Sequence, residues 1–419
     1  MMVTMHRRLA LALALVLAAC GGGGGSLLLP AGAPGRSPAG VTPAENATGL
    51  PGENATGLPG ENATGLPGEN ATGLPGENAT GLPGTQFSCA PVSADGQARC
   101  TLEIDVDAGT LADPETPASM IPGLHPADLQ SAYGLPVQAA GGTIAVVDAY
   151  DDPTAESDLA TYRSAFGLTP CSSADGCFRK VDQAGVAGNY PAANAGWANE
   201  TALDLAMISA ACPRCRILLV EANSDAMDDL GSSVDTAVSL GATAVSNSYY
   251  ASEWASEPAE DAHYDHPDVA ITASSGDAAA PFYPAASRFV TAVGGTSLAR
   301  ANGGWSETVW SMGGRGCSAY VARPAWQHRT GCSTRATVDM AAVADPKTGV
   351  AVFSTTAGGW IVAGGTSVGA PLLAGAYGLA GNGAGPAYAY AHPDAFRSIQ
   401  GPGYGSATGL GAPAGIAGL

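Results

Sequence analysis

From about residue 120, short runs of apolar residues alternate with longer segments in which apolar residues recur at helical spacing. Repeated strand–helix–strand units favour a parallel sheet with helices on both faces, because each crossover has to pack against the sheet. We therefore predict an α/β fold, with strands over 143–147, 216–220, 244–247, 270–274 and 289–293, and helices ending near 165 and spanning 200–211 and 232–240. Such sheets carry their functional groups at the carboxyl ends of strands, where this chain has Asp148, Asn247 and Ser274-Ser-Gly-Asp277.

An excess of acidic residues distinguishes this chain from proteins that bind nucleic acid. It has 37 Asp and Glu against 17 Lys and Arg, which gives a net charge of −20 at pH 7. Phosphate binding draws on clustered Lys and Arg, so we expect no nucleic-acid partner. The same balance suits a protein that stays soluble in acid, although an ordinary acidic secreted protein would show it too.

The first 20 residues have the pattern of an export signal. His6-Arg7-Arg8 precede an apolar run over 9–19 that is too short to span a bilayer as a mature helix. The ending Leu17-Ala-Ala-Cys20 resembles a bacterial lipobox, in which Cys20 becomes the lipidated first residue, although a chance match is the alternative in so Ala- and Leu-rich a leader. We predict a lipoprotein-type signal peptide over 1–20. The protein would then be exported, and would contact the outer membrane or cell surface only through this anchor unless it is released.

A tether is predicted between this anchor and the folded part of the chain. Five octads run from Pro43 to Leu82, and each has one Leu together with Pro and Gly. One apolar residue per octad cannot build a core, so we expect 21–86 to be a disordered linker.

Eight further cysteines lie in four close sequence pairs. They allow on the order of 100 pairings, of which closure between sequence neighbours is the simplest in an oxidising compartment. The expected disulfides are Cys89–Cys100, Cys171–Cys177, Cys212–Cys215 and Cys317–Cys332. A redox or zinc role for the third pair is less favoured, because that pair ends a helix and has no further ligands nearby. We predict a short disulfide-containing segment over 87–118, followed by the main domain over 119–419.

Ser367 is the candidate nucleophile. The segment Gly364-Gly-Thr-Ser-Val-Gly-Ala-Pro371 lies between a strand at 360–363 and a helix from Leu372. Glycines allow a tight strand-to-helix turn, and the N–H groups of the following helix could stabilise an oxyanion. A structural glycine turn is the alternative. Gly294-Gly-Thr-Ser297 repeats the tetrad, but we interpret it as a strand end. An esterase elbow is excluded, because only His392 and Asp394 follow, in the wrong order.

The residues that would activate Ser367 are carboxylates. None of the six histidines stands at a helix start suited to a Ser-His-Asp triad. Glu200 and Asp204 are four residues apart and share one face of a predicted helix. Taken alone they could be an ordinary acidic helix start. A buried carboxylate that shares its proton with a second one can, however, act as a base.

Four ordered motifs resemble the sedolisin family of serine-carboxyl peptidases over about 124–411. They are Asp128-Leu-Gln-Ser-Ala-Tyr-Gly134, Glu200-x-x-x-Asp204, Ser274-Ser-Gly-Asp277 and Gly365-Thr-Ser-x-x-x-Pro371. The resemblance implies a subtilisin-like three-layer fold with a mainly parallel central sheet, polypeptide substrates and a monomer.

By the same resemblance, Ser367 would be the nucleophile, Glu200 the general base and acid, and Asp204 the residue that orients Glu200 and shares its proton. Asp277 would donate a hydrogen bond in the oxyanion hole. A carboxyl donates only when neutral, so activity is expected in acid.

Two features depart from the family pattern. The family usually has a long prosegment, whereas about thirty residues lie between the predicted tether and the domain. Ser398 and Ser406 stand near the positions where the family places calcium-binding carboxylates, ahead of Thr408-Gly-Leu-Gly411. Backbone carbonyls alone make a poor calcium site, so we predict no cofactor or metal and a less stable C-terminal region.

The function expected from the sequence is an acid-active endopeptidase or exopeptidase that forms an acyl-enzyme on Ser367. One alternative is a subtilisin-like enzyme with Asp148 as the triad acid, which would stay active at pH 8. The other is a catalytically impaired surface binding protein, because the calcium carboxylates and the prosegment are missing.

Overall fold

A computed structural model describes residues 82–92, 94–328, 330–401 and 403–419. The predicted signal peptide, Cys20 and the tether up to residue 81 lie outside the described residues. Among the described helices, none is long and apolar enough to cross a bilayer.

A central sheet of eight strands confirms the predicted α/β fold. Its order is β12-β11-β9-β7-β4-β6-β5, with β15 paired to β11, and every pairing is parallel except that of β12 with β11. The strands are β4 (Thr143–Ala149), β5 (Phe178–Asp182), β6 (Arg216–Ala222), β7 (Ala244–Asn247), β9 (Ala270–Ser274), β11 (Thr291–Ala301), β12 (Gly304–Val309) and β15 (Met340–Val343).

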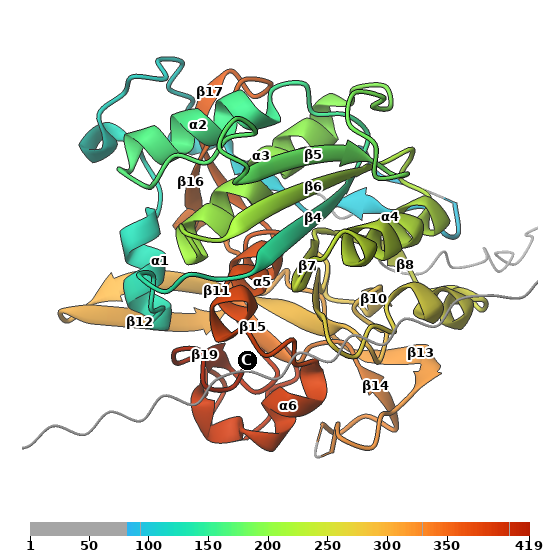
Figure 1. The fold of residues 1–419 in the computed structure, drawn as a ribbon. Helices are drawn as coiled ribbons and strands as arrows, with labels where there is room; N and C mark the ends of the chain where they lie inside the picture. The colour runs from blue at the N-terminus through green and yellow to red at the C-terminus, as the bar shows by residue number, and fades with distance from the viewer. Residues whose placement is uncertain (1–81, 93, 329, 402) are drawn as a thin grey trace, which may run out of the picture. The chain divides into compact units, whose positions relative to one another are not determined.

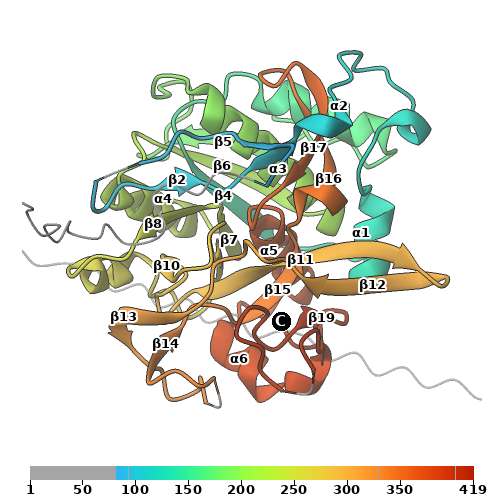
Figure 2. The same cartoon turned by 180° about the vertical axis from the view of Figure 1, so that it is seen from behind.

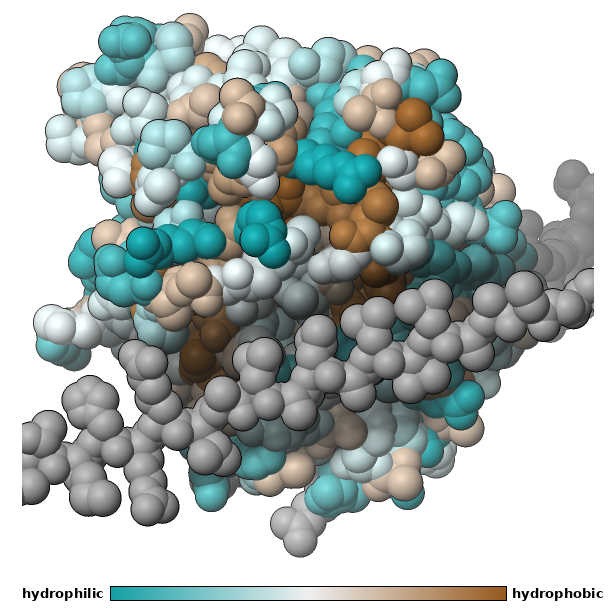
Figure 3. Space-filling model, viewed as in Figure 1, coloured by the Kyte–Doolittle hydropathy of each residue, from teal (hydrophilic) through white to brown (hydrophobic). Residues whose placement is uncertain are grey.

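Helices cover both faces of this sheet and make three layers (Figures 1 and 2). Ile144 and Val146 of β4 enter the hydrophobic core on one face, whereas the alternate residue Val147 enters the core on the other. The first core also contains residues of α1 (Pro126–Tyr133), α2 (Ala155–Ala165), α3 (Ala195–Ala211) and α5 (Gly369–Ala380), and the second contains residues of α4 (Met227–Ser239). On the face seen in Figure 3, hydrophobic residues form only small patches among polar ones.

Residues 85–105, from the region before the predicted main domain, form strands that join the domain's smaller sheets. One sheet has the order β1-β3-β17-β16 and another β10-β8-β2. Their strands are β1 (Thr85–Phe87), β2 (Arg99–Cys100), β3 (Glu103–Asp105), β8 (Tyr249–Ser252), β10 (Phe282–Tyr283), β16 (Val350–Ser354) and β17 (Gly359–Gly364). β1 therefore begins two residues inside the segment predicted as tether.

The remaining elements are short. They are β13 (Cys317–Ala322), β14 (Thr334–Ala336), α6 (Pro386–Ala391), β18 (Phe396–Arg397), β19 (Ala412–Pro413) and 3-10 turns at Val106–Ala108, Ala118–Met120, Glu257–His263, Pro346–Thr348 and Pro393–Ala395. Disulfides join Cys89–Cys100, Cys171–Cys177, Cys212–Cys215 and Cys317–Cys332, which are the four pairs expected from sequence proximity.

Several predicted element boundaries were wrong. The helix predicted over 200–211 begins five residues earlier, because the Asn194 side chain accepts hydrogen bonds from the first backbone N–H groups of α3. α4 and α5 also begin before the predicted residues 232 and 372. The strand predicted over 289–293 begins at Thr291 and continues to Ala301, so Gly294-Gly-Thr-Ser297 lies inside a strand. Pairing with both β15 and β12 extends that strand.

A buried ion pair connects the C-terminal region to the central sheet. Arg335 donates to both carboxylate oxygens of Asp339, at 2.8 and 2.5 Å, and both side chains are fully buried. Asp339 also accepts hydrogen bonds from the Tyr390 hydroxyl at 3.0 Å and from Ala292 N, in β11, at 2.9 Å. This network therefore links α6 to the sheet.

Replacing Arg335 by Met should lower the free energy of unfolding by roughly 3–5 kcal/mol, because Asp339 would be left as an uncompensated buried charge. Urea unfolding near pH 5 measures the loss. Arg300→Ala is the matched control: Arg300 pairs with Asp128, but its side chain is 70% exposed, so the loss there should stay below about 1 kcal/mol. Equal losses in the two variants would contradict the role given to the buried pair.

Candidate active site

Ser367 lies in the strand-to-helix turn between β17 and α5 and is fully buried. Gly365 makes the turn with a φ of 94°, a conformation that favours glycine. A Cβ on Gly365 would also lie only 1.7 Å from the carbonyl oxygen of Thr101. The sequence pattern around Ser367 therefore reflects both a left-handed backbone and the close approach of another segment.

Glu200 and Asp204 lie on α3, which is buried along residues 197–211. Glu200 Oε2 accepts a hydrogen bond of 2.8 Å from Leu102 N. Burial raises the pKa of the Glu200 carboxyl well above its usual range, and the nearby Ser367 hydroxyl acts in the opposite direction. Within the described residues, Glu200 Oε1 and both carboxylate oxygens of Asp204 have no hydrogen-bond partner. The structure thus brings the predicted base, its neighbouring acid and the predicted nucleophile together.

Asp148, at the carboxyl end of β4, is a third buried carboxyl beside this pair. Its Oδ2 accepts a hydrogen bond of 2.9 Å from the Thr201 hydroxyl. Burial raises the pKa of Asp148 to about 7, against the lowering effect of Thr201. Burial, followed by the charge of Asp148, raises the pKa values of Glu200 and Asp204 well above their usual range. These three carboxyls therefore keep protons at a higher pH than isolated carboxyls do, because ionising all three in one buried place is unfavourable.

Asp277 follows β9 and faces the same turn. Its Oδ1 accepts hydrogen bonds from Thr366 N at 2.8 Å and from the Thr366 hydroxyl at 2.7 Å. Its Oδ2 is buried and has no partner within the described residues. Burial, followed by the charge of Glu103, raises the pKa of Asp277 well above its usual range. Asp277 Oδ2 is therefore placed to carry a proton.

Residues 99–105 lie directly over these groups. The sequence did not predict this position for them. The Thr101 hydroxyl contacts the Ser367 hydroxyl and lies 3.3 Å from the Ser274 hydroxyl. Glu103 is fully buried, and burial raises its pKa to about 7. No local pattern could reveal these contacts, because they join positions about 100 to 270 residues apart in the sequence.

Among the described residues, no histidine hydrogen-bonds to Ser367, and the side chains of four of the five histidines have partners elsewhere. Their partners are the Ile121 carbonyl for His125, Asp235 for His263 and His266, and the Tyr388 carbonyl for His392. A Ser-His-Asp triad that uses Asp148 is therefore not assembled in the described part of the chain.

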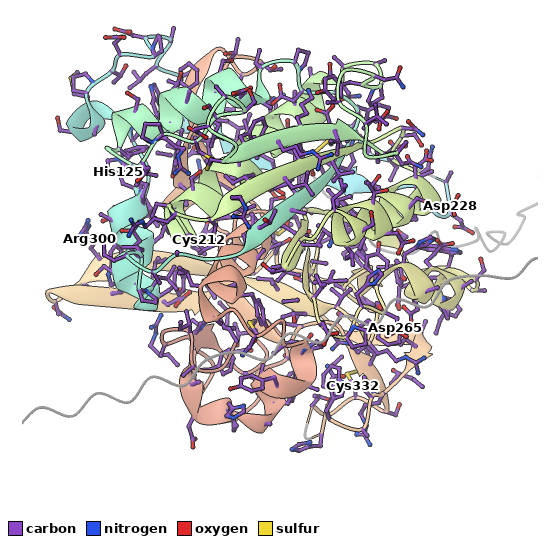
Figure 4. All side chains as sticks on the ribbon, in the orientation of Figure 1. His125, Cys212, Asp228, Asp265, Arg300 and Cys332 are labelled. Carbon is purple, nitrogen blue, oxygen red and sulfur yellow. A yellow bond between two sulfur atoms is a disulfide. The ribbon has the colours of Figure 1, made fainter. Side chains whose placement is uncertain are left out.

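Potential metal ligands do not include the candidate catalytic side chains. In the described ranges, the group of side chains able to share a metal ion is Asp228, Glu260 and His263, whose ligand atoms lie within 4.8 Å of one another. Asp228 belongs to the first turn of α4 and is labelled in Figure 4. Ser398 and Ser406 are exposed. A cavity of about 500 Å³ is lined by residues of α2 and β5 and not by those of the candidate site.

Comparisons with known proteins support the same type of fold. No family model matches the chain. Kumamolisin from Bacillus sp. (strain MN-32) is 34% identical over 172 residues, which cover 32% of this chain and 31% of that protein. The chain thus spans about a third of the length of the curated relative that it matches. The structure of Pseudomonas sedolisin, a serine-carboxyl proteinase complexed with pseudo-iodotyrostatin, matches with a TM-score of 0.60 and 22% identity, over 70% of this chain and 96% of that one. The chain is therefore sedolisin-like and has the subtilisin-like fold, as predicted.

The raised pKa values predict that the domain is more stable in acid than at neutral pH. A carboxyl whose pKa is higher in the folded than in the unfolded state binds more protons when folded. Its stabilising contribution is complete below the unfolded pKa and is lost as the pH rises through the folded pKa. For Asp148 this window runs from 3.8 to about 7. Urea unfolding of the Ser367→Ala protein should therefore show stability falling between pH 4.5 and 7.

Asp148→Asn tests the origin of that slope. Removing one such group should reduce the fall by up to about 1.4 kcal/mol per pH unit. Asp265→Asn, at an exposed position that Figure 4 shows, should leave the slope unchanged. An Asp148→Asn protein with the parent's slope would refute the assignment.

Proposed function

We propose that the protein is a serine-carboxyl peptidase that hydrolyses peptide bonds in acid through an acyl-enzyme on Ser367. One observation carries the proposal: three separate segments bring a hydroxyl (Ser367), a pair of carboxyls (Glu200 and Asp204) and a further carboxyl (Asp277) to one buried place. The likeness to kumamolisin and to the sedolisin fold supports the same chemistry.

In this mechanism Glu200 removes the proton from Ser367 as the hydroxyl attacks a peptide carbonyl, and later gives it to the leaving nitrogen. Asp204 and Asp148 favour the protonated form of Glu200, because a further negative charge beside them would be unfavourable. Asp277, neutral in acid, donates a hydrogen bond to the oxyanion. Because this donation needs a protonated carboxyl, the rate should fall as the pH rises.

The proposal extends to the protein's place in the cell. Export through residues 1–20 and anchoring at the outer membrane or cell surface through Cys20, with release as the alternative, fit the pattern of the sequence. Four disulfides suit an oxidising compartment. We propose a monomer that acts on polypeptides, with neither a nucleic-acid partner nor a resident metal.

One observation favours the second candidate function, a binding protein with impaired catalysis. Ser367, Glu200, Asp204 and Asp277 all have an exposed fraction of zero, so a polypeptide cannot reach them in the described conformation. An active peptidase therefore has to displace the covering residues 99–105.

The first functional prediction concerns the nucleophile and the base. After incubation in acid, the protein should hydrolyse a denatured polypeptide between pH 3 and 6, and Ser367→Ala or Glu200→Gln should each lower kcat/KM by at least about 10⁴-fold. Arg300→Ala is a control at an exposed position and should stay near the parent rate. Inactivity of the parent throughout this range would favour the binding protein, whereas activity at pH 8 that survives Glu200→Gln would favour a different triad.

The second prediction tests whether Asp277 acts in its protonated form, as a hydrogen-bond donor, and not in its ionised form. Asp277→Ala should lower kcat by about 10²–10³-fold, because the oxyanion loses a donor. In Asp277→Asn the amide can donate at any pH while its oxygen still accepts from Thr366. This variant should therefore keep more activity than Asp277→Ala, and its rate should decline at higher pH than the parent's. Identical pH–rate profiles for Asp277→Asn and the parent would contradict an oxyanion donor at this position.

A further inference from the structure

The imidazole of His263 lies between two carboxylates that project from one face of α4. Asp228 and Asp235 are two helical turns apart on the same side of this helix. His263 Nδ1 lies 2.6 Å from Asp235 Oδ2, and His263 Nε2 lies 3.9 Å from Asp228 Oδ1. Each ring nitrogen therefore faces a carboxylate.

Gly231 makes room for this ring. It lies on α4 between the two carboxylates, and a Cβ at this position would be 2.6 Å from His263 Cδ2 and 2.8 Å from His263 Cγ. Glycine is unfavourable inside a helix, and the close approach of the imidazole accounts for its presence here. The side chain of His263 is 23% exposed, so packing and a hydrogen bond together fix the ring.

The hydrogen bond to Asp235 decides which nitrogen of His263 is free. A carboxylate only accepts hydrogen bonds, so Nδ1 has to donate, and the neutral ring keeps a lone pair on Nε2. Asp235 is held in turn by His266, whose Nε2 lies 3.0 Å from its other oxygen. A carboxylate that orients an imidazole in this way is the usual outer partner of a metal-binding histidine.

Glu260 supplies a third ligand atom near the free nitrogen. It belongs to the 3-10 turn Glu257–His263, three residues before His263. The ligand atoms of Asp228, Glu260 and His263 all lie within 4.8 Å of one another. Around one tetrahedral zinc ion such atoms are about 3.3 Å apart, because each bond is about 2.0–2.2 Å long. Small side-chain rotations are therefore enough to close the three ligands on an ion.

We propose that Asp228, Glu260 and the Nε2 atom of His263 bind a divalent transition-metal ion, with zinc as the best fit. Two carboxylates balance its charge, and the imidazole nitrogen favours zinc over magnesium and calcium, which prefer oxygen ligands. Three protein ligands leave a position for water, and the side chain of Asp228 is 86% exposed. The ion therefore exchanges with solution and is a reversible ligand, not a resident cofactor.

This site is separate from the candidate active site. α4 contributes to the core on one face of the central sheet, whereas α3 and α5 contribute to the core on the other face. The ion joins α4 to the 3-10 turn that packs against it. Its binding stabilises the conformation in which these two segments are in contact, and it does not depend on the chemistry proposed for Ser367.

Isothermal titration of the full Ser367→Ala chain with zinc chloride at pH 7 tests the site in the absence of proteolysis. One ion should bind per chain, and zinc should raise the melting temperature as its concentration increases. Asp228→Asn, Glu260→Gln and His263→Ala should each weaken binding by at least about 100-fold, because loss of an outer partner alone costs about 10–100-fold. Asp265→Asn, at the other exposed carboxyl labelled in Figure 4, is the matched control and should leave the affinity unchanged.

Asp235→Asn tests the orienting role separately. Its amide oxygen can still accept from His263 Nδ1 but has lost the negative charge, so the affinity for zinc should fall by about 10–100-fold while one ion still binds. Circular dichroism checks that each variant folds, and Asp228→Asn changes an exposed side chain that the fold does not need.

The outcomes are decisive for this inference alone. Absence of zinc binding, or zinc binding that Asp228→Asn and Glu260→Gln leave unchanged, would overturn it. Calcium chloride bound as tightly as zinc chloride would also overturn it, because the imidazole would then not be a ligand. None of these results bears on the proposed function, whose test is hydrolysis by the protein with Ser367 in place.

Discussion

The burial of several carboxyl groups against one another is the constraint on which the site depends. Glu200, Asp204 and Asp148 lie in a helix and a strand whose surroundings are apolar, so burial disfavours their ionised forms. Asp277 is subject to the same effect from a different loop. A rigid three-layer fold can hold such a group in place, because the central sheet and α3 are stabilised by their own cores. The buried carboxyls of this site therefore share protons with one another.

The turn that carries Ser367 shows how the backbone serves this arrangement. Gly365 provides a left-handed conformation and leaves space into which the Thr101 carbonyl fits. Thr366 donates twice to Asp277, which fixes the loop after β9 against the turn after β17. Two loops that are distant in sequence therefore act as one rigid unit.

Local sequence patterns were sufficient for most of the central sheet, because strands, helix faces and glycine turns have short-range signatures. The grouping of Ser367, Glu200, Asp204 and Asp277 into one site came from the resemblance of their motifs to a known family. The predicted disulfides were also local. Element starts were less predictable: the Asn194 cap moved the beginning of α3, and two-sided pairing lengthened β11. Asp148 was expected at the carboxyl end of a strand and as an alternative triad acid, but not beside Glu200, since its contact with α3 depends on packing. Thr101, Leu102 and Glu103 were missed altogether, because pairing between segments more than 250 residues apart leaves no mark on either segment alone.

The pairing of β2 with β8 also bears on competition between ligands. A strand attached to the same chain has an effective local concentration in the millimolar range for a short flexible linker, so a free polypeptide present at micromolar levels is outcompeted for the same backbone edge. The edge of β8 therefore binds residues 99–100 in preference to a free polypeptide because they belong to the same chain, and not because their side chains are recognised.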